Sequence, residues 1–386
     1  MEYKPITLVH LITELNVGGA EQMLFKLLSL LDKKKFRCIV ISMTDEGFVG
    51  EKIIESGIKL FTLGMRLGRP TIRGFMSLCY LLKKESVDIL QTWLYHADLL
   101  GLVAGKISGV KNIVWNIRCS DMELRNYNFL TTLVVRANSL LSPIPDAIIV
   151  NSVEGKKIHE KLGYNLKKTF IIPNGFDTDI FIPDESAKER LLHQLELPEN
   201  SILIGLVARF DPMKDHENFL KAASIASAHN NRLHFVLVGE GVNINNRDLM
   251  SSIQKKGLLG KISLLGLRFD INSIVPAFDI AVSSSSYGEG FSNAIGEAMA
   301  CGVPCVVTDI GDSALIVADT GKVVPPRSPN QFAEALLEMI AIPEARRKKL
   351  GMEGRTRIKS LFSIDKIAFQ YENLYLKFAE AKGIMP

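Results

Sequence analysis

The chain has 386 residues, of which 47% are hydrophobic and 23% are charged, and its formal net charge is +4. This composition is too apolar for a disordered chain, and the length suits two domains. The charge is far below that of a dedicated nucleic-acid-binding protein, so we expect no nucleic-acid partner.

Cysteine content and hydropathy favour a cytoplasmic protein. The five cysteines are an odd number scattered mostly through apolar runs, which is typical of reduced core thiols. The N-terminal residues lack the pattern of a signal peptide. The most apolar segment, 129–150, is interrupted by Arg136, Pro143, Pro145 and Asp146. Any contact with a membrane is therefore expected to be peripheral.

The first half of the chain alternates short runs rich in Ile and Val with longer amphipathic stretches, the pattern of a parallel sheet built through helical crossovers. Helices are predicted at 20–31 and 72–84, where apolar residues recur every three or four positions. The predicted strands are 6–12, 37–43, 58–63, 87–93, 112–117, 146–152 and 168–173. These elements predict a doubly wound, Rossmann-like domain over residues 1–180.

A turn-rich segment at 173–184 and a polar stretch up to residue 200 predict a linker. The alternation then resumes, with strands predicted at 202–208, 233–238, 262–266, 279–283 and 304–308. Residues 195–362 should form a second α/β domain of the same architecture, and we expect the two domains to face a central cleft. The segment 363–386 has the spacing of an amphipathic helix and should pack back on the first domain.

Two cations, Arg209 and Lys214, follow the first strand of the second domain. Ligands of parallel α/β sheets bind beyond the carboxyl ends of the strands. Fixed positive charges there could neutralise a departing diphosphate, the role that a metal has elsewhere. Solvated loop side chains are the alternative, but the position after the strand favours the binding role.

Two glutamates, Glu289 and Glu297, stand eight residues apart after the strand at 279–283. Glycines flank the first glutamate, and a helix predicted to start near Phe291 presents unpaired N–H groups to an anion. Two carboxylates beside a phosphate site are explained if they bind hydroxyls, and a nucleotide sugar offers those of a ribose and a hexose. The alternative is a solvated turn with a surface glutamate.

This pattern resembles the retaining glycosyltransferases of family 4, whose hallmark is two glutamates separated by seven residues and whose two Rossmann-like domains form the GT-B fold. The resemblance covers nearly the whole chain. It implies transfer of a hexosyl or N-acetylhexosaminyl group from a nucleotide diphosphate sugar, without a metal or other cofactor. It assigns the donor sugar to Glu289, the ribose to Glu297 and the leaving group to Arg209 and Lys214.

Further donor contacts come from the same resemblance. The loop around Leu267 and Arg268 frames the base in the family, and its backbone could hydrogen-bond the edge of a uracil. A UDP-sugar is the expected donor, but the sequence leaves the identity of the base open. The other residues implied at the donor site are Gly18, Gly19, Gly290, Phe291, Ser292 and Asn293.

The acceptor side departs from the family pattern. The family often has a histidine after the fifth strand, where this chain has Asn116, Ile117 and Arg118. The active-site histidine is therefore either absent or supplied by His96, which follows the fourth strand.

Arginines are concentrated near glycines after the third strand, at Arg66, Arg69 and Arg73, and Arg118 and Arg125 follow the fifth. A guanidinium can bind phosphate through two parallel hydrogen bonds, which favours an anionic acceptor such as a lipid-linked diphosphate sugar or a growing glycan at a membrane surface. An ordinary solvated basic loop is the alternative.

Two other classes of function stay open at this point. A nucleotide-sugar epimerase or hydrolase could use the same paired domains, and a product formed without an acceptor would identify it. The second open class is a nicotinamide-dependent oxidoreductase or a non-catalytic nucleotide-binding protein. The missing dinucleotide fingerprint argues against the oxidoreductase, and the polar residues collected after the strands argue against mere binding.

Overall fold

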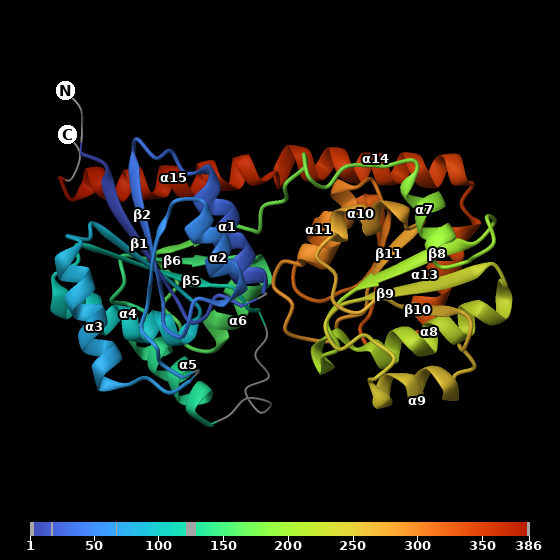
Figure 1. The fold of residues 1–386 in the computed structure, drawn as a ribbon, viewed down its shortest axis with the longest axis horizontal. Coiled ribbons are helices and arrows are strands. Elements are labelled where there is room, and N and C mark those ends of the chain that lie inside the picture. The colour runs from blue at the N-terminus through green and yellow to red at the C-terminus, as the bar shows by residue number, and fades with distance from the viewer. Residues whose placement is uncertain (1–3, 17, 67, 121–128, 384–386) are drawn as a thin grey trace. The chain divides into compact units, whose positions relative to one another are not determined.

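The chain forms two compact units, each with a parallel sheet covered by helices on both faces (Figure 1). Unit 1 comprises Met1–Gly175 together with Ile364–Pro386, and unit 2 comprises Phe176–Ser363. The residues that the computed structural model describes are 4–16, 18–66, 68–120 and 129–383. The predicted fold class, two doubly wound α/β domains, is confirmed.

The sheet of unit 1 has the strand order β3-β2-β1-β4-β5-β6-β7, with parallel pairing throughout. The interior strand β1, between β2 and β4, is buried along its whole length, as expected for a strand covered on both faces. In the register of the sheet, Ile6 of β1 lies opposite Phe36 of β2. The strands are β1 (Ile6–Ile12), β2 (Phe36–Ser42), β3 (Lys59–Thr62), β4 (Ile89–Trp93), β5 (Asn112–Ile117), β6 (Ala147–Val150) and β7 (Thr169–Ile171).

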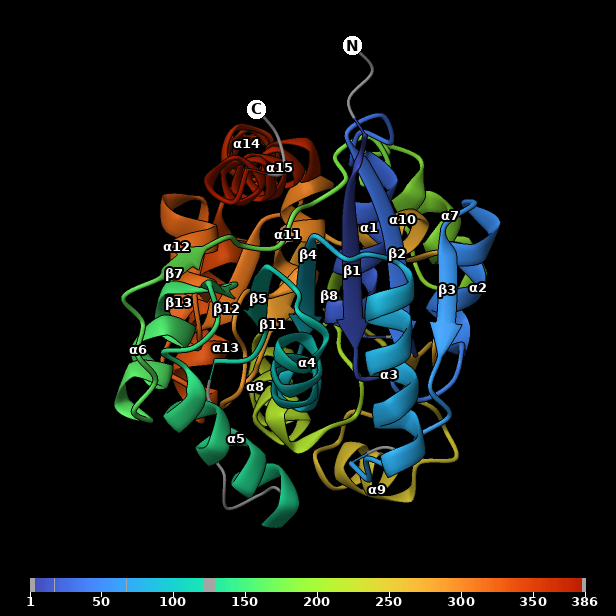
Figure 2. The same ribbon diagram turned by 90° about the vertical axis from the view of Figure 1, so that its left-hand side faces the viewer.

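Helices cover both faces of this sheet (Figure 2). On one face lie α1 (Gly19–Leu30), α2 (Gly47–Glu55) and α15 (Ile364–Ala381), and on the other lie α3 (Ile72–Lys84), α4 (Tyr95–Ser108) and α5 (Phe129–Leu141). The remaining helix is α6 (Val153–Lys161). Local signals fix the helix ends: the Thr71 hydroxyl caps α3 by accepting the Gly74 N–H at 3.1 Å, and Gly109 ends α4 in the left-handed conformation.

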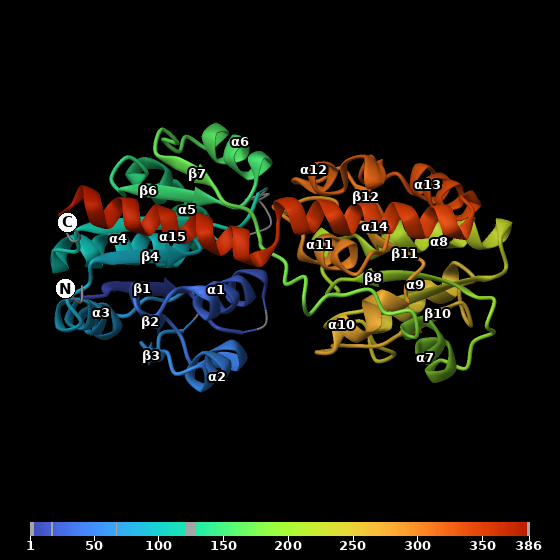
Figure 3. The same cartoon turned by 90° about the horizontal axis from the view of Figure 1, so that it is seen from above.

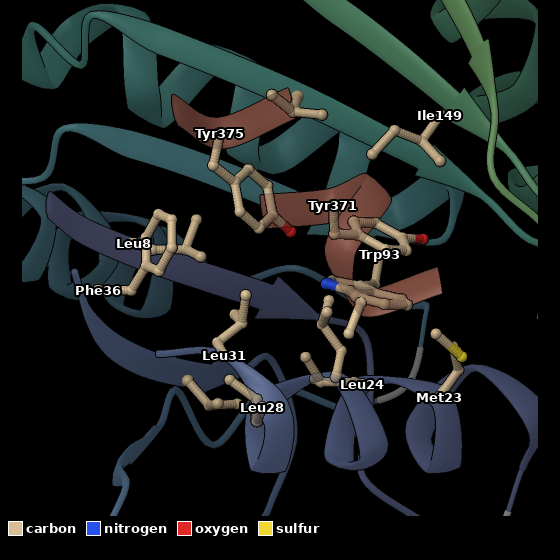
Figure 4. Packing of buried hydrophobic residues seen from close by; sticks show 14 of the residues in the cluster. Leu8, Met23, Leu24, Leu28, Leu31, Phe36, Trp93, Ile149, Tyr371 and Tyr375 are labelled. Carbon is tan, nitrogen blue, oxygen red and sulfur yellow. The ribbon is translucent and has the colours of Figure 1, made fainter. Parts of the chain in front are cut away.

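The C-terminal helix α15 supplies part of the core of unit 1, as Figure 4 shows from close by. Tyr371 and Tyr375 are fully buried, and the Tyr371 ring stacks on Trp93 with centroids 6.5 Å apart. The Tyr375 hydroxyl donates to the side chain of Gln91 on β4. Aromatic packing and a buried hydrogen bond therefore join the last helix to the middle of the sheet.

The sheet of unit 2 has the strand order β10-β9-β8-β11-β12-β13 and is also parallel (Figure 3). The strands are β8 (Ile202–Val207), β9 (Leu233–Val238), β10 (Ile262–Leu264), β11 (Ile280–Ser283), β12 (Cys305–Thr308) and β13 (Gly321–Val324). The helices are α7 (Ala187–Gln194), α8 (His216–His229), α9 (Arg247–Lys255), α10 (Ile271–Ile274), α11 (Asn293–Ala300), α12 (Ser313–Val317), α13 (Pro329–Ala341) and α14 (Glu344–Leu361).

Some elements of unit 2 differ from the sequence prediction. The segment expected as a linker contains α7, which buries Ala187, Leu191 and Leu192 in the core. Neither β13, a short edge strand, nor the highly charged helix α14 was predicted. None of the described helices is long and apolar enough to cross a membrane.

Candidate active site

An ion pair joins the two motifs of unit 2 at the carboxyl ends of β8 and β11. Lys214 ends a 3-10 turn, η2 (Pro212–Lys214), and its ammonium donates to the Oε2 atom of Glu289. The Ser285 hydroxyl donates to the same oxygen at 3.0 Å. Only 17% of the lysine side chain and 11% of the glutamate side chain are exposed. The fold therefore brings together two charged residues that lie far apart in the sequence.

The environment of Glu289 keeps its carboxylate ionised. Burial is the largest single influence and raises its pKa, but the charge of Lys214 and the hydrogen bonds from Lys214 and Ser285 together outweigh burial. The charge of Arg209 acts in the same direction and is the smallest of these influences. The net result is a lowered pKa, so the cluster is a true ion pair at neutral pH.

Arg209 stands at the start of the same loop and is held by a neighbouring aspartate. Its Nε atom donates to the Oδ2 atom of Asp211 at 3.1 Å, and 54% of the arginine side chain is exposed. The other oxygen of Asp211 accepts the Met213 N–H at 2.9 Å and so caps η2. Sequence reasoning missed this role of Asp211, although an aspartate followed by proline is a recognisable helix start.

Serines tie the loops around the ion pair to one another. The Ser284 hydroxyl donates to the carbonyl oxygen of Lys214 at 2.7 Å, and the Ser286 N–H donates to that of Met213 at 2.9 Å. From the next strand, the Thr308 hydroxyl donates to the Ser285 carbonyl oxygen at 2.6 Å. The loops after β8 and β11 are thereby fixed to each other and to the end of β12. No local sequence pattern indicates this role for the hydroxyl groups.

The backbone of Glu289 and Gly290 packs against the turn at Gly311 and Asp312. Gly311 has a φ of +60°, and a Cβ atom there would lie 2.2 Å from the carbonyl oxygen of Glu289. The next residue, Asp312, donates its N–H to the Gly290 carbonyl oxygen at 2.9 Å. Only glycine allows this approach, so Gly311 sets the position of the glutamate loop.

The helix after this loop, α11, begins at Asn293, two residues later than predicted, with Ser292 at its N-cap. The Phe291 side chain is buried, with its ring centroid 6.0 Å from that of Phe176 and 5.1 Å from that of Phe362. Its side chain anchors the loop, so only its backbone could serve a ligand. Glu297 lies on α11 one turn after Asn293, and both are half-buried.

The loop after β10 holds Leu267 and Arg268. Both Nε and Nη2 of Arg268 donate to the carboxylate of Asp270, at 2.7 and 2.5 Å, which occupies its guanidinium, whereas Leu267 is 48% exposed. The Gly266 carbonyl oxygen accepts the Gly239 N–H at 2.8 Å, which joins this loop to the one after β9. These contacts fix the backbone that was predicted to frame the base.

In unit 1, Gly18 is the N-cap of α1 and Gly19 begins the helix. A Cβ atom on Gly18 would lie 2.2 Å from Oε2 of the buried Glu21. That atom is the far end of a flexible side chain and no backbone atom lies close, so this contact alone does not require glycine at position 18.

Arg118 and Asn116 point into the interior of unit 1. Arg118 donates to the Tyr371 hydroxyl at 3.1 Å and to the side chain of Asn174, and its guanidinium lies 5.4 Å from the centre of the Trp93 ring. Asn116 donates to the same tyrosine hydroxyl at 3.2 Å. These two acceptor-side candidates thus form a cluster with α15, and their contacts are those of a structural anchor. Tyr371 and Asn174 could not have been found from local sequence.

The other acceptor-side candidates are separate from that cluster. His96 lies half-buried in the first turn of α4, and burial lowers its pKa, so its imidazole is neutral at pH 7. Arg66, Arg69 and Arg73 are all exposed, and the Arg69 N–H donates to the Arg66 carbonyl oxygen at 2.9 Å in a turn just before α3. Among the described residues, no hydrogen bond or ion pair joins these arginines to His96 or Arg118. Arg125 lies outside the described residues.

The expectation of metal-independent chemistry stays a prediction. Within the described part of the chain, no group of three or more His, Cys, Asp or Glu side chains is placed to hold a metal ion.

Comparison with known families accounts for both units. A family model described as Glycosyltransferase Family 4 matches residues 17–180, and one described as Glycosyl transferases group 1 matches residues 201–341. The chain belongs to glycosyltransferase family 4. This family 4 enzyme therefore transfers a hexosyl or N-acetylhexosaminyl group from a nucleotide sugar. Of the functions that the sequence left open, the family supports the transferase and not the epimerase, hydrolase or oxidoreductase.

Two curated relatives of the family 4 enzyme are similar over most of their length. The UDP-Gal:alpha-D-GlcNAc-diphosphoundecaprenol alpha-1,3-galactosyltransferase of Escherichia coli is 28% identical over 312 residues, which cover 79% of each chain. The N-acetylgalactosamine-N,N'-diacetylbacillosaminyl-diphospho-undecaprenol 4-alpha-N-acetylgalactosaminyltransferase of Campylobacter jejuni is 27% identical over 362 residues, or 90% of this chain and 94% of the relative.

Solved structures match the fold of the family 4 enzyme. Anabaena HepE in complex with UDP has a TM-score of 0.83 at 20% identity, over 96% of this chain and 100% of that one. The sucrose-phosphate synthase of Thermosynechococcus elongatus has a TM-score of 0.79 at 19% identity, over 97% and 100% of the two chains. Both likenesses confirm the GT-B fold.

Proposed function

We propose that the enzyme uses a UDP-sugar and transfers the sugar, with retention of its anomeric configuration, to a hydroxyl of a lipid-linked diphosphate sugar or a growing glycan. The reaction takes place at the cytoplasmic face of a membrane and needs no metal. The observation that carries the proposal is the largely buried pair of Lys214 and Glu289 beside Arg209, at the carboxyl ends of β8 and β11.

The donor half of the proposal follows from where the charges lie. In the transfer, the acceptor oxygen forms a bond to the anomeric carbon while the bond from that carbon to the diphosphate breaks. The acceptor proton passes to the departing phosphate on the same face of the sugar, so no protein nucleophile is needed. Lys214 and Arg209 are fixed by carboxylates, and their positive charges would stabilise the leaving diphosphate.

The two glutamates would divide the recognition of the donor. Glu289 is an ionised acceptor whose position is set by Lys214, Ser285 and the Gly311 turn, so it suits the hydroxyls of the transferred sugar. Glu297 lies along α11 beyond the phosphate-binding N-terminus of the helix and suits the ribose.

The acceptor half rests on exposed cations and on the named relatives. Arg66, Arg69 and Arg73 are exposed around the turn before α3 and could bind a diphosphate. Both curated relatives are named for acceptors joined to undecaprenol through a diphosphate. The same arginines would hold the enzyme near a membrane that contains such an acceptor.

A direct experiment begins with a screen of nucleotide sugars for protection against thermal unfolding. Products formed on undecaprenyl diphosphate sugars would then be identified by mass spectrometry, and NMR would assign the new anomeric linkage. We expect a UDP-sugar to protect, the donor configuration to be retained, and activity to survive EDTA. An inverted product, activity that requires added magnesium or manganese, or sugar release without an acceptor would each contradict the proposal.

A further inference from the structure

Helix α5 is apolar in sequence, yet it packs few of its residues into the core. Its buried residues are Val135 and Asn138. Phe129 is 79% exposed, Leu133 is 53% exposed and Leu140 is 82% exposed. With Arg136 these residues follow one another at steps of four, three and four, so they form a single stripe on the solvent side of the helix.

Helix α3 carries a second stripe of the same kind. Ile72, Met76 and Tyr80 recur every four residues and are 80%, 59% and 62% exposed. Helix α4 packs between α3 and α5 on the same face of the sheet, as Figures 1 and 2 show, and its Ile107 is 58% exposed. Single exposed apolar side chains are ordinary on a protein surface, but a set spread over three adjacent helices indicates an interaction surface.

The charge of this surface has one sign. In α3, α4 and α5, all of whose residues the structure describes, the only acidic residue is Asp98, which is buried and accepts a hydrogen bond from Thr92 at 2.5 Å. Glu85, just after α3, is also turned inward and pairs with Arg37 and Lys59. The exposed charged residues of the three helices are Arg73, Lys83, Lys84, Lys106 and Arg136.

The opposite face of the same sheet has a different character. Helix α2 exposes Glu51 and Glu55, and α15 exposes Asp365. The combination of apolar stripes and exclusively positive charge is therefore a property of the α3, α4 and α5 face and does not extend to the helices across the sheet.

We propose that the face formed by α3, α4 and α5 docks unit 1 on an anionic phospholipid bilayer. The apolar stripes would enter the boundary between headgroups and acyl chains, and the lysines and arginines would contact lipid phosphates. A second copy of the chain is a poorer occupant, because a symmetric dimer through this face would set its cations against identical cations. The inference extends the proposed function, which places the acceptor in a membrane, but its test needs neither donor nor acceptor.

The test measures binding of the full chain to vesicles by co-sedimentation. We expect binding to vesicles that contain phosphatidylglycerol and much weaker binding to pure phosphatidylcholine. The triple variant Phe129→Gln, Leu133→Gln and Leu140→Gln should bind phosphatidylglycerol vesicles at least about tenfold more weakly, because it removes apolar area that the bilayer would bury. Its melting temperature should stay near that of the wild type, since all three side chains are more than half exposed.

A matched control removes similar apolar side chains elsewhere. Ile244, Leu259 and Phe369 are 74%, 57% and 63% exposed and lie outside the three helices. Their triple replacement by Gln should leave vesicle binding unchanged. Equal losses in the test and control variants would overturn the proposal, and so would wild-type binding by the test variant.

Two further measurements separate the competing explanations. Replacing Lys83, Lys84 and Arg136 by Gln should remove the preference for phosphatidylglycerol, with about a fivefold loss per cation. Light scattering should show the same oligomeric state for the wild type and the apolar variant. If the wild type were a dimer and the variant a monomer, the face would be a subunit interface and the proposal would be overturned. Transfer to a short-chain acceptor in detergent should survive the apolar substitutions, so a failure of docking is distinguishable from a failure of the proposed reaction.

Discussion

Replacing Lys214 by methionine keeps most of the aliphatic stem but removes the ammonium that pairs with the Glu289 carboxylate, while the hydrogen bond from Ser285 stays in place. Breaking a buried pair by removing one partner costs about 3–5 kcal/mol. The two side chains keep 17% and 11% exposure, so we expect the lower end of that range, about 3 kcal/mol in the free energy of unfolding. Urea denaturation measures the loss.

The control is Lys221→Met. Lys221 pairs with Glu217 at 3.5 Å on the surface of α8, where both side chains are about half exposed. The same substitution there should cost no more than about 1 kcal/mol. If both variants lose the same stability, the buried pair has no special role in unit 2.

The pH dependence gives a second check with a definite sign. In the wild type the pKa of Glu289 is lowered, so its contribution to stability is present above the unfolded pKa and is lost as the pH falls through the folded value. Without Lys214, burial dominates and the pKa rises, so the folded variant loses stability as the pH increases through that raised value. The gap in melting temperature between the two proteins should therefore narrow from about pH 7 towards about pH 4.5. A gap that stays constant would refute the reasoning.

Turnover separates the structural role of Lys214 from its chemical one. Lys214→Met should lower kcat by about 10²-fold or more, because a fixed charge opposite the leaving diphosphate is lost. Adding Glu289→Gln to that variant should recover most of the lost stability, since no unpaired charge stays buried, but it should not recover turnover. Wild-type turnover in a folded Lys214→Met protein would remove this residue from the mechanism.

Three further predictions concern the rest of the site. Glu297→Ala should weaken binding of the nucleotide diphosphate by about 1.5–3 kcal/mol, as measured by calorimetry, because the ribose loses a charged acceptor; unchanged affinity would contradict the assignment. Joint replacement of Arg66, Arg69 and Arg73 by Gln should raise the acceptor KM while donor affinity stays constant, and an unaltered KM would leave these arginines as ordinary surface residues. Gly311→Ala should lower the free energy of unfolding by about 1–3 kcal/mol and should also lower turnover. The new methyl group would clash with the Glu289 carbonyl oxygen, and the positive φ is strained for alanine. A fully active variant would show that the turn can move freely.

Much of the fold was predictable because the pattern of a parallel sheet is strong. Buried strands such as β1 and β9 are mostly apolar and contain few polar residues, and their predicted bounds agree with the structure. The elements that were missed lack this signal. The edge strand β13 contains Gly321 and Lys322, and α14 is so highly charged that its few buried positions are hard to recognise. In α7 the buried residues are too few to reveal a helix within a polar segment.

Part of the candidate site was predictable because the functional residues of parallel α/β sheets lie just beyond the carboxyl ends of the strands. That rule found Lys214 and Glu289 separately, but their ion pair depends on neighbouring strands that only the topology brings together. The rule also selected Arg118, whose side chain turns inward to Tyr371, a residue far away in the sequence. Local patterns identify a loop, whereas the direction of a side chain depends on partners that the patterns do not contain.

The path of the chain through unit 1 also bears on how the protein is made. During translation, residues 1–175 leave the ribosome long before α15 is made. The core around Trp93 therefore lacks Tyr371 and Tyr375 while all of unit 2 is synthesised. Unit 2 is continuous in sequence and can close its core in the meantime. A nascent or truncated chain that ends at Ser363 thus presents an open apolar surface to chaperones and proteases. Any chimera that exchanges unit 1 between relatives must therefore carry the last helix together with the first 175 residues.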